Sequence, residues 1–245
     1  MNIFPFIYNE IIYRPLFNAL AFLTGVVPYH DVGIAIIILT ILVRIIIFPL
    51  THRSLLTQIK MKELEPHINK IRETHKDKAD EQGKKIMELY KEHGVNPLSG
   101  CFLLLIQLPI LIALYRLFWK GLLSGGNLYS FISMPSPIKT HFLGLVDLAL
   151  PSWTFAFLAA ASQFAQMKLA NPTIPKKGTS MREEMSRAFA IQSLYIFPAL
   201  IFFISIKFPA ALALYWTSSN LFATLHEAVV RRRARLMYGR GEGKN

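Results

Sequence analysis

An arginine lies inside an apolar stretch of this 245-residue chain. Arg44 stands in TILVRIIIFPL, residues 40–50, among isoleucine, leucine, valine and phenylalanine. A charge at the centre of a membrane span costs about 3 kcal/mol on insertion scales, so it needs water, headgroups or a partner. One explanation is that the side chain bends to the nearer headgroups. Thr40 lies one helical turn earlier on the same face, however, which indicates a polar stripe rather than a single polar point.

Three other apolar stretches carry polar residues at a similar depth. Gln107 lies in LIQLPIL, two glutamines share a face of ASQFAQM, and LYWTSSN adds hydroxyl, amide and aromatic groups. Each could form a private hydrogen bond between helices, which is the usual role of a single glutamine in a span. Agreement in depth across four stretches favours a shared hydrophilic groove instead. The candidate groove residues from these stretches are Arg44, Thr40, Gln107, Gln163, Gln166, Tyr215 and Ser219.

The motifs do not indicate an enzyme. His226 and Glu227 in LHEAVV lack the second histidine of a zinc-binding H-E-x-x-H motif, and there is no G-x-S-x-G or phosphate-binding glycine loop. Cys101 is the only cysteine, which excludes an intramolecular disulfide. We therefore expect no catalytic residue, no metal, no cofactor and no small-molecule substrate. The alternative that stays open is a small ion or solute pore or carrier that uses the same polar stripe.

Long apolar stretches must position these residues. The chain is 53% hydrophobic and 17% charged, below the ~25% that is typical of soluble domains. Apolar blocks alternate with charged ones, which is typical of an all-α polytopic membrane protein. Five blocks are long enough to cross a hydrocarbon core of ~30 Å. We expect these spans at about residues 32–50, 98–119, 151–170, 191–207 and 209–229.

The remaining segments are expected to lie outside the hydrocarbon. Residues 1–31 are apolar but interrupted by Glu10, Arg14 and Pro15, which predicts an amphipathic helix in the outer interface. Residues 52–96 show helical spacing on both sides of the polar run HKDKADEQG, which predicts a cytoplasmic helical hairpin. The stretch FLGLVDLAL, residues 142–150, is too short to cross. The hairpin's expected apolar face includes Leu56, Ile59, Leu64, Ile68, Ile71, Ile86, Leu89 and Tyr90.

Basic residues predict the orientation. The formal net charge is +12, and most of the 27 Lys and Arg fall in residues 51–97, 168–190 and the tail 230–245. The positive-inside rule places these segments in the cytoplasm and the N-terminus outside. The tail arginines are expected to contact anionic lipid or, alternatively, ribosomal RNA. They are Arg231, Arg232, Arg233 and Arg235.

Four segments, in order, resemble the YidC-type membrane protein insertases, which are related to the mitochondrial Oxa and chloroplast Alb insertases. They are ILVRIIIFPLTHRS, GVNPLSGCFLLLIQLPILIALYRLF, FLGLVDL and FPAALALYWTSSNLF. The resemblance covers about residues 11–235. It implies five transmembrane helices (32–229) around a cytoplasm-open hydrophilic groove, an N-terminal interfacial helix and a cytoplasmic hairpin. By position it implies groove-facing or substrate-facing roles for Arg44, Thr40, Gln107, Gln163, Tyr215 and Trp216.

The resemblance also implies an activity and a location. The activity is insertion and folding of nascent membrane proteins without ATP hydrolysis by this chain, alone or beside the Sec translocon. The expected partners are nascent membrane proteins, the ribosome, the Sec translocon and anionic lipids. The expected location is the bacterial plasma membrane, with several spans, the N-terminus outside and the C-terminus in the cytoplasm. A hydrated inner-leaflet groove would pass polar and acidic segments, and Arg44 would attract the acidic ones.

Overall fold

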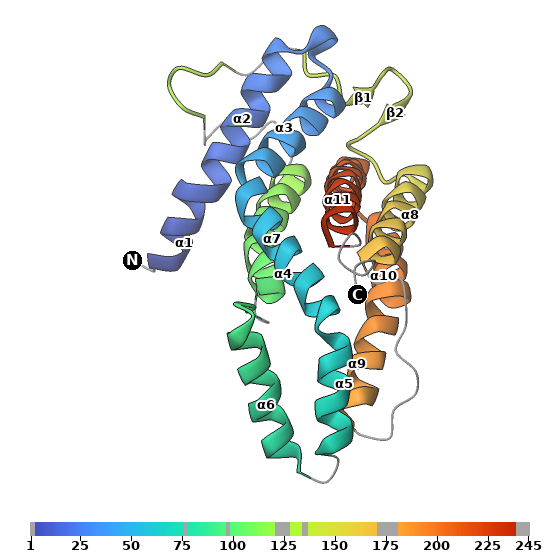
Figure 1. The fold of residues 1–245 in the computed structure, drawn as a ribbon. Helices are drawn as coiled ribbons and strands as arrows, with labels where there is room; N and C mark the ends of the chain where they lie inside the picture. Colours follow the sequence, from blue (N-terminus) through green and yellow to red (C-terminus); the bar gives the residue numbers. More distant parts are fainter. Residues whose placement is uncertain are drawn as a thin grey trace. The chain divides into compact units, whose positions relative to one another are not determined.

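Helices dominate the computed structural model, which describes residues 3–75, 78–96, 99–120, 128–133, 137–170 and 181–238 (Figure 1). The chain forms two compact units, Met1–Ile46 with Pro109–Ala228 and Ile47–Leu108 with Val229–Asn245. The described elements are α1 (Ile3–Tyr8), η1 (Asn9–Tyr13), α2 (Arg14–Val26), η2 (Pro28–His30), α3 (Val32–Ile46), α4 (Phe48–Glu63), α5 (Glu65–Thr74), α6 (Ala79–Glu92), α7 (Ser99–Lys120), β1 (His141–Phe142), β2 (Val146–Asp147), α8 (Trp153–Ala170), α9 (Met181–Ile191), η4 (Gln192–Ile196), α10 (Phe197–Ser205) and α11 (Ala210–Tyr238).

The first unit begins with a helix that runs through α1, η1 and α2. Pro15 has no N–H to donate within the helix, and the chain accommodates it with the π-helical turn η1, whose end the Arg14 N–H closes onto the Asn9 carbonyl. Phe17 and Leu20 of α2 are fully buried, and α2 lies beside α3 (Figure 1). The helix expected within residues 1–31 is therefore present. Its place in the outer interface stays a prediction.

A small hairpin organises the beginning of α3. Strands β1 and β2 pair antiparallel, so that FLGLVDLAL forms turns and strands. The Asp31 carboxylate accepts hydrogen bonds from the Gly33, Ile34 and Leu143 N–H groups at 2.7, 3.2 and 2.7 Å. It thus caps α3 and fixes the hairpin with the same side chain. The strands are an addition to the expected all-α architecture.

The hairpin segment also receives the start of α11. The N–H groups of Ala210 and Ala211 donate to the carbonyls of Leu150 and Leu148 at 2.9 and 3.1 Å. These bonds satisfy two of the N–H groups that a helix leaves unpaired at its first turn. Helix α10 ends at Ser205 and α11 starts at Ala210, so the turn expected around Lys207 and Pro209 is confirmed.

Helix α3 ends earlier than expected. The sequence predicts a span to residue 50, whereas α3 stops at Ile46 and α4 starts at Phe48. Pro49 is the reason, because its ring clashes with the carbonyl four residues earlier and it has no N–H for a continuous helix. Helix α3 therefore ends four residues before the expected end of the first span, and Arg44 lies in its last turn. The extent of the span itself stays a prediction.

The other expected spans coincide with helices α7, α8, α9 to α10, and α11. Within the described residues, Arg187–Ser205 is long and apolar enough to cross a membrane alone, α3 and α4 qualify only as a pair, and Gln107–Phe118 is a shorter apolar helix. Helices α8 and α10 pack closely along their lengths (Figure 1). Two boundaries differ from expectation, because helix already begins at Met181 and α11 continues to Tyr238. Residues 239–245 of the tail lie outside the described residues.

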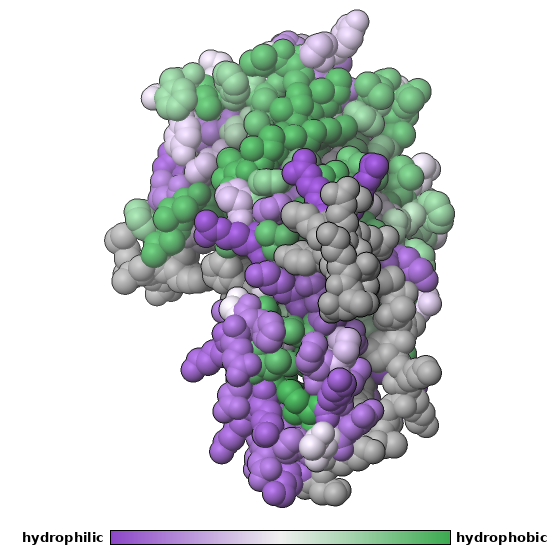
Figure 2. Space-filling model, viewed as in Figure 1, coloured by the Kyte–Doolittle hydropathy of each residue, from purple (hydrophilic) through white to green (hydrophobic). Residues whose placement is uncertain are grey.

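The second unit contains the expected hairpin. Helices α5 and α6 pack through Leu64, Ile68, Ile86 and Val95, all of which are buried. On α4, Leu55 and Ile59 are buried with Val230, whereas Leu56 is exposed. The prediction that Leu56 belongs to the buried apolar face was therefore wrong, and its neighbour Leu55 takes that place. Figure 2 shows hydrophilic residues over α5 and α6.

The surface of α3 in the first unit is different. Ile41, Leu42, Ile45 and Ile46 are all exposed large hydrophobic side chains, and Figure 2 shows hydrophobic residues over this part of the unit. A contiguous apolar surface of this kind is what a helix presents to lipid.

Candidate functional site

Arg44 is half-buried and bonds to a hydroxyl group. Its Nε and Nη2 atoms donate to Ser219 Oγ at 2.9 and 2.5 Å, so the last turn of α3 is joined to the first half of α11. Ser219 is only 2% exposed. Tyr215, one turn earlier on α11, also interacts electrostatically with Arg44. Two of the candidate groove residues, Arg44 and Ser219, are thus in contact, and the acceptor is neutral.

The residue after Ser219 joins α11 to a third helix. Asn220 Nδ2 donates to Ser162 Oγ of α8 at 3.1 Å, and that hydroxyl donates to the Ala159 carbonyl at 2.9 Å. Asn220 is buried. Adjacent residues of α11 therefore connect α3 and α8 by side-chain hydrogen bonds, so polar groups from three of the expected spans meet at one level of the first unit. Ser162 was not among the candidates, because a small hydroxyl residue is common in apolar helices.

Thr40 and Tyr215 are enclosed. Thr40 is 2% exposed and its hydroxyl donates to the Ile36 carbonyl of its own helix at 2.6 Å. Both side chains line a cavity of about 10 Å³ whose other walls are apolar. That volume is at the lower limit for one water molecule. In this conformation these two residues form part of the packed core and shape the surroundings of Arg44 from within.

The two glutamines of α8 lie nearer the surface. Gln163 and Gln166 are both half-buried and three positions apart on one helix, so they lie on the same face of α8. Trp216 is also half-buried and packs against the edge of the core. These three side chains belong to the same unit as Arg44 and offer amide and indole groups that can contact an extended polar segment.

The remaining candidates belong to the second unit. Gln107 is half-buried on α7. Of the tail arginines, Arg231 is half-buried while Arg232 and Arg233 are exposed on α11, and the side chain of Arg235 lies outside the described residues. Their roles stay predictions.

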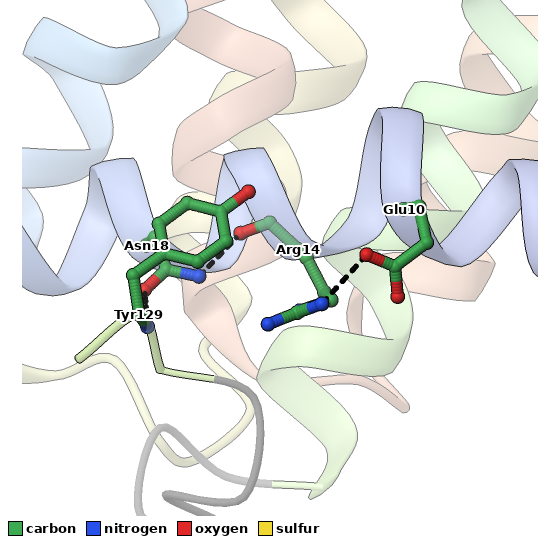
Figure 3. A network of polar contacts seen from close by, with 4 residues as sticks. All are labelled: Glu10, Arg14, Asn18 and Tyr129. Carbon is green, nitrogen blue, oxygen red and sulfur yellow. Dashed lines mark hydrogen bonds and ion pairs between the residues drawn. The ribbon is translucent and has the colours of Figure 1, made fainter.

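A second polar network fixes the N-terminal helix (Figure 3). Asn18 is buried, donates to the Arg14 carbonyl at 2.8 Å and accepts from the Tyr129 N–H at 2.7 Å. Arg14 pairs with Glu10 at 2.6 Å and lies over the Tyr129 ring at 5.2 Å. In sequence, Glu10 and Arg14 appear only as interruptions of an apolar pattern. Their spacing of four residues was the available signal for a pair on one helix face.

A further cationic contact ties this helix to α7. The Arg116 guanidinium lies 5.7 Å from the Tyr8 ring centre and 5.4 Å from that of Tyr13. Burial is the largest influence on both phenols and raises the pKa of Tyr8 and of Tyr13, while the nearby Arg116 charge opposes the rise. Both hydroxyls therefore stay protonated at physiological pH.

The apolar helices α3, α8 and α11 are joined by side-chain hydrogen bonds next to the half-buried Arg44. This combination is typical of a helical membrane protein. The chain belongs to the 60Kd inner membrane protein family, which matches residues 22–236.

Proteins named membrane protein insertase YidC are among its relatives. The one from Fusobacterium nucleatum is 33% identical over 224 residues, which cover 91% of this chain and 98% of the relative. Those from Campylobacter jejuni and Francisella tularensis subsp. novicida are 33% and 34% identical over 89% and 82% of this chain, but this chain spans only 37% and 32% of their lengths. The resemblance seen in the sequence is therefore confirmed.

Proposed function

We propose that this protein inserts newly made membrane proteins into the bacterial plasma membrane. It receives polar and acidic segments of a nascent chain in a hydrated groove of the inner leaflet and releases the apolar helices into lipid, alone or with the Sec translocon. The relatives named as insertases support this activity. The proposed activity needs no catalytic group, because transfer of apolar surface from water to lipid is itself favourable.

One observation carries the proposal: Arg44 has a neutral partner. A structural arginine in a membrane protein is expected to pair with a carboxylate, since a charge left without one is costly. Arg44 instead donates to the Ser219 hydroxyl. A hydroxyl supplies no negative charge, and a carboxylate from the cargo binds a guanidinium more strongly than a hydroxyl does. The site thus suits temporary binding of an acidic segment.

The side chains proposed to touch cargo are those nearer the surface of the first unit. Arg44 binds acidic groups, and Gln163, Gln166 and Trp216 contact the polar chain around them. Thr40 and Tyr215 are buried, so we assign them to the inner wall that supports Arg44. Gln107 belongs to the second unit, and its part in the groove stays a prediction from the sequence.

The hairpin, the basic end of α11 and the N-terminal helix are proposed to receive the cargo and to fix the orientation of the protein in the membrane. We propose five spans with the N-terminus outside, because most basic residues fall in the segments assigned to the cytoplasm. The hairpin of α5 and α6 and the basic end of α11 face the cytoplasm, where they meet the nascent chain and either anionic lipid or the ribosome. The N-terminal helix lies in the outer interface.

Photo-crosslinking tests the proposed function. A photoreactive residue replaces Gln163 in membranes that carry ribosome-stalled nascent membrane proteins with a short acidic tail. We expect a crosslink as the first cargo helix emerges, and about a tenfold weaker one for Arg44→Ala, since a hydrogen bond to a charged group is worth ~1.5–3 kcal/mol. The matched control places the probe at Phe203, which is 63% exposed on α10 and should not react with the tail.

The outcomes separate three interpretations. A folded protein that gives no crosslink from position 163 contradicts the insertase proposal. A crosslink that does not depend on Arg44 keeps the insertase and reduces the arginine to contact with headgroups. A pore or carrier would instead admit a membrane-impermeant thiol reagent to cysteines at positions 163 and 216 from both sides, whereas the proposed groove admits it from the cytoplasm only.

A further inference from the structure

The guanidinium of Arg44 uses one of its two hydrogen-bonding edges. Nε and Nη2 form the side edge of the group, and both donate to the single oxygen Ser219 Oγ. The end edge consists of Nη1 and the second N–H of Nη2. In an arginine both edges present two parallel N–H groups in fixed geometry. Ser219 therefore accepts the hydrogen bonds of the side edge, and the end edge forms none with it.

The end edge is open. Across the described part of the chain no hydrogen bond from Nη1 is found, and the enclosed side-chain atoms without a partner there are Tyr8 Oη, Arg187 Nε and Ser205 Oγ. Nη1 does not belong to that set, so it is reachable from the molecular surface. A group that arrives from outside can consequently bind Arg44 while Ser219 stays bound.

Ser219 is itself held in place. Asn220 follows it on α11 and donates to Ser162 of α8, whose hydroxyl donates to the Ala159 carbonyl. Ser219 and Asn220 are 2% and 4% exposed, so neither side chain can turn away without leaving a buried polar group unpaired. The contact to α8 thus fixes the rotation of α11 that points Ser219 at Arg44.

We propose that Ser219 is a positioning residue that presents the end edge of Arg44 to one carboxylate of the cargo and makes the site selective for acidic over neutral polar segments. This inference rests on the proposed function. A carboxylate offers two acceptor oxygens that match two parallel N–H groups. An amide of the same shape offers one oxygen, and its NH2 group faces the guanidinium donors without an acceptor. A fixed end edge therefore discriminates aspartate from asparagine, and a mobile guanidinium discriminates less.

The test compares two cargo tails that differ only by aspartate or asparagine at the same positions. The full chain in membranes carries the photoreactive residue at position 163, and the readout is the ratio of crosslink yields for the two tails. We expect a ratio of about ten for the unchanged protein. For Ser219→Ala the ratio should fall to about two, with the yield for the asparagine tail changed less than about twofold.

Three further variants isolate the role of Ser219. Ser219→Thr keeps the hydroxyl and should restore the ratio. Arg44→Lys keeps the charge but has no planar edge, so it should lower the ratio as Ser219→Ala does. Thr217→Val removes another α11 hydroxyl, one that donates only to the Ala213 carbonyl of its own helix, and should leave the ratio unchanged.

Two results would overturn the positioning role: an unchanged ratio in Ser219→Ala, or equal loss of both yields, which a purely structural role would cause. Absence of any crosslink from the unchanged, folded protein is a different result, because it removes the proposed function and not only this inference.

Discussion

The Arg44 guanidinium donates its hydrogen bonds to the hydroxyl of Ser219 and not to a carboxylate. Its unusual place could be recognised in the sequence, because a single charge within an apolar stretch is visible there. Its partner could not. Ser219 lies 175 positions away, and Asn220 and Ser162 lie 58 apart, so these contacts depend on which faces of α3, α8 and α11 meet. Hydropathy does not report how apolar helices are rotated.

The absence of a side chain at Gly33 lets the Phe142 ring approach α3 closely, which gives a first testable prediction. A Cβ atom added there would lie 2.2 Å from Cδ2 and 2.7 Å from Cγ of the Phe142 ring. Gly33→Ala should therefore force β1 away from α3 and destabilise the protein by about 1–3 kcal/mol, as overpacking does. The measurement is thermal unfolding of the purified protein in detergent.

The matched control is Gly25→Ala on α2. Nothing lies within 4 Å of a Cβ atom at that position. Alanine is favoured over glycine in a helix, so Gly25→Ala should raise stability slightly, by about 0.5 kcal/mol. If the two variants had the same melting temperature, the close approach of Phe142 to Gly33 would be refuted.

Among the elements, the N-terminal helix gives a second prediction. Asn18 is the buried residue that joins α2 to the segment of Tyr129 (Figure 3). Asn18→Ala leaves the Tyr129 N–H without its acceptor, which should cost about 1–3 kcal/mol locally. We expect faster amide hydrogen exchange in residues 14–26 and 128–133, with little change in α8 and α10.

Glu10→Gln is the control for this network. It breaks the ion pair between Glu10 and Arg14. The side chain of Arg14 is 31% exposed and that of Glu10 is 39% exposed. Exposed pairs contribute ~1 kcal/mol or less, so exchange in residues 14–26 should stay close to that of the unchanged protein. A larger effect of Glu10→Gln than of Asn18→Ala would show that the ion pair, not the buried amide, fixes this helix.

The hairpin of α5 and α6 gives a third prediction. Ile86 is 4% exposed and packs against Leu64 and Ile68. Ile86→Ala should destabilise the hairpin by about 2–5 kcal/mol, because it removes buried apolar volume. Limited proteolysis should then cut residues 65–92 much faster than in the unchanged protein.

Met87 supplies the comparison for Ile86. It is the next residue on α6 and is 54% exposed. Met87→Ala should leave the cleavage rate nearly unchanged, since exposed substitutions usually alter stability by less than about 0.5 kcal/mol. Equal cleavage of the two variants would contradict the packing of α5 on α6.

The elements also show how far sequence patterns reach. The helices and the α5–α6 hairpin could be predicted because apolar residues recur at helical spacing over many residues. The β1–β2 hairpin has only four strand residues and a turn with Leu143 at φ 51° and Gly144 at φ 73°. Such a short element leaves no period to recognise. The break between α3 and α4 was not foreseen although Pro49 marks it, because apolar character continues to Leu50.

At the scale of the whole molecule, the orientation is the testable feature. Replacement of Cys101 by serine allows single cysteines at position 29 or 87, where Tyr29 and Met87 are 79% and 54% exposed. An impermeant maleimide should label position 29 only from outside the cell and position 87 only after the cytoplasmic side is opened, as the distribution of basic residues predicts. Labelling of both positions from one side would refute the proposed topology.

The early end of α3 has an electrostatic consequence for Arg44. Backbone dipoles of a helix add up to about half a negative charge at its C-terminus, where the last carbonyls lack N–H partners. Because Pro49 ends α3 near Ile46, Arg44 falls within that last turn. A cation there gains about 0.3–1 kcal/mol, and more where water is scarce. The backbone itself thus acts as a diffuse counter-charge to the Arg44 guanidinium.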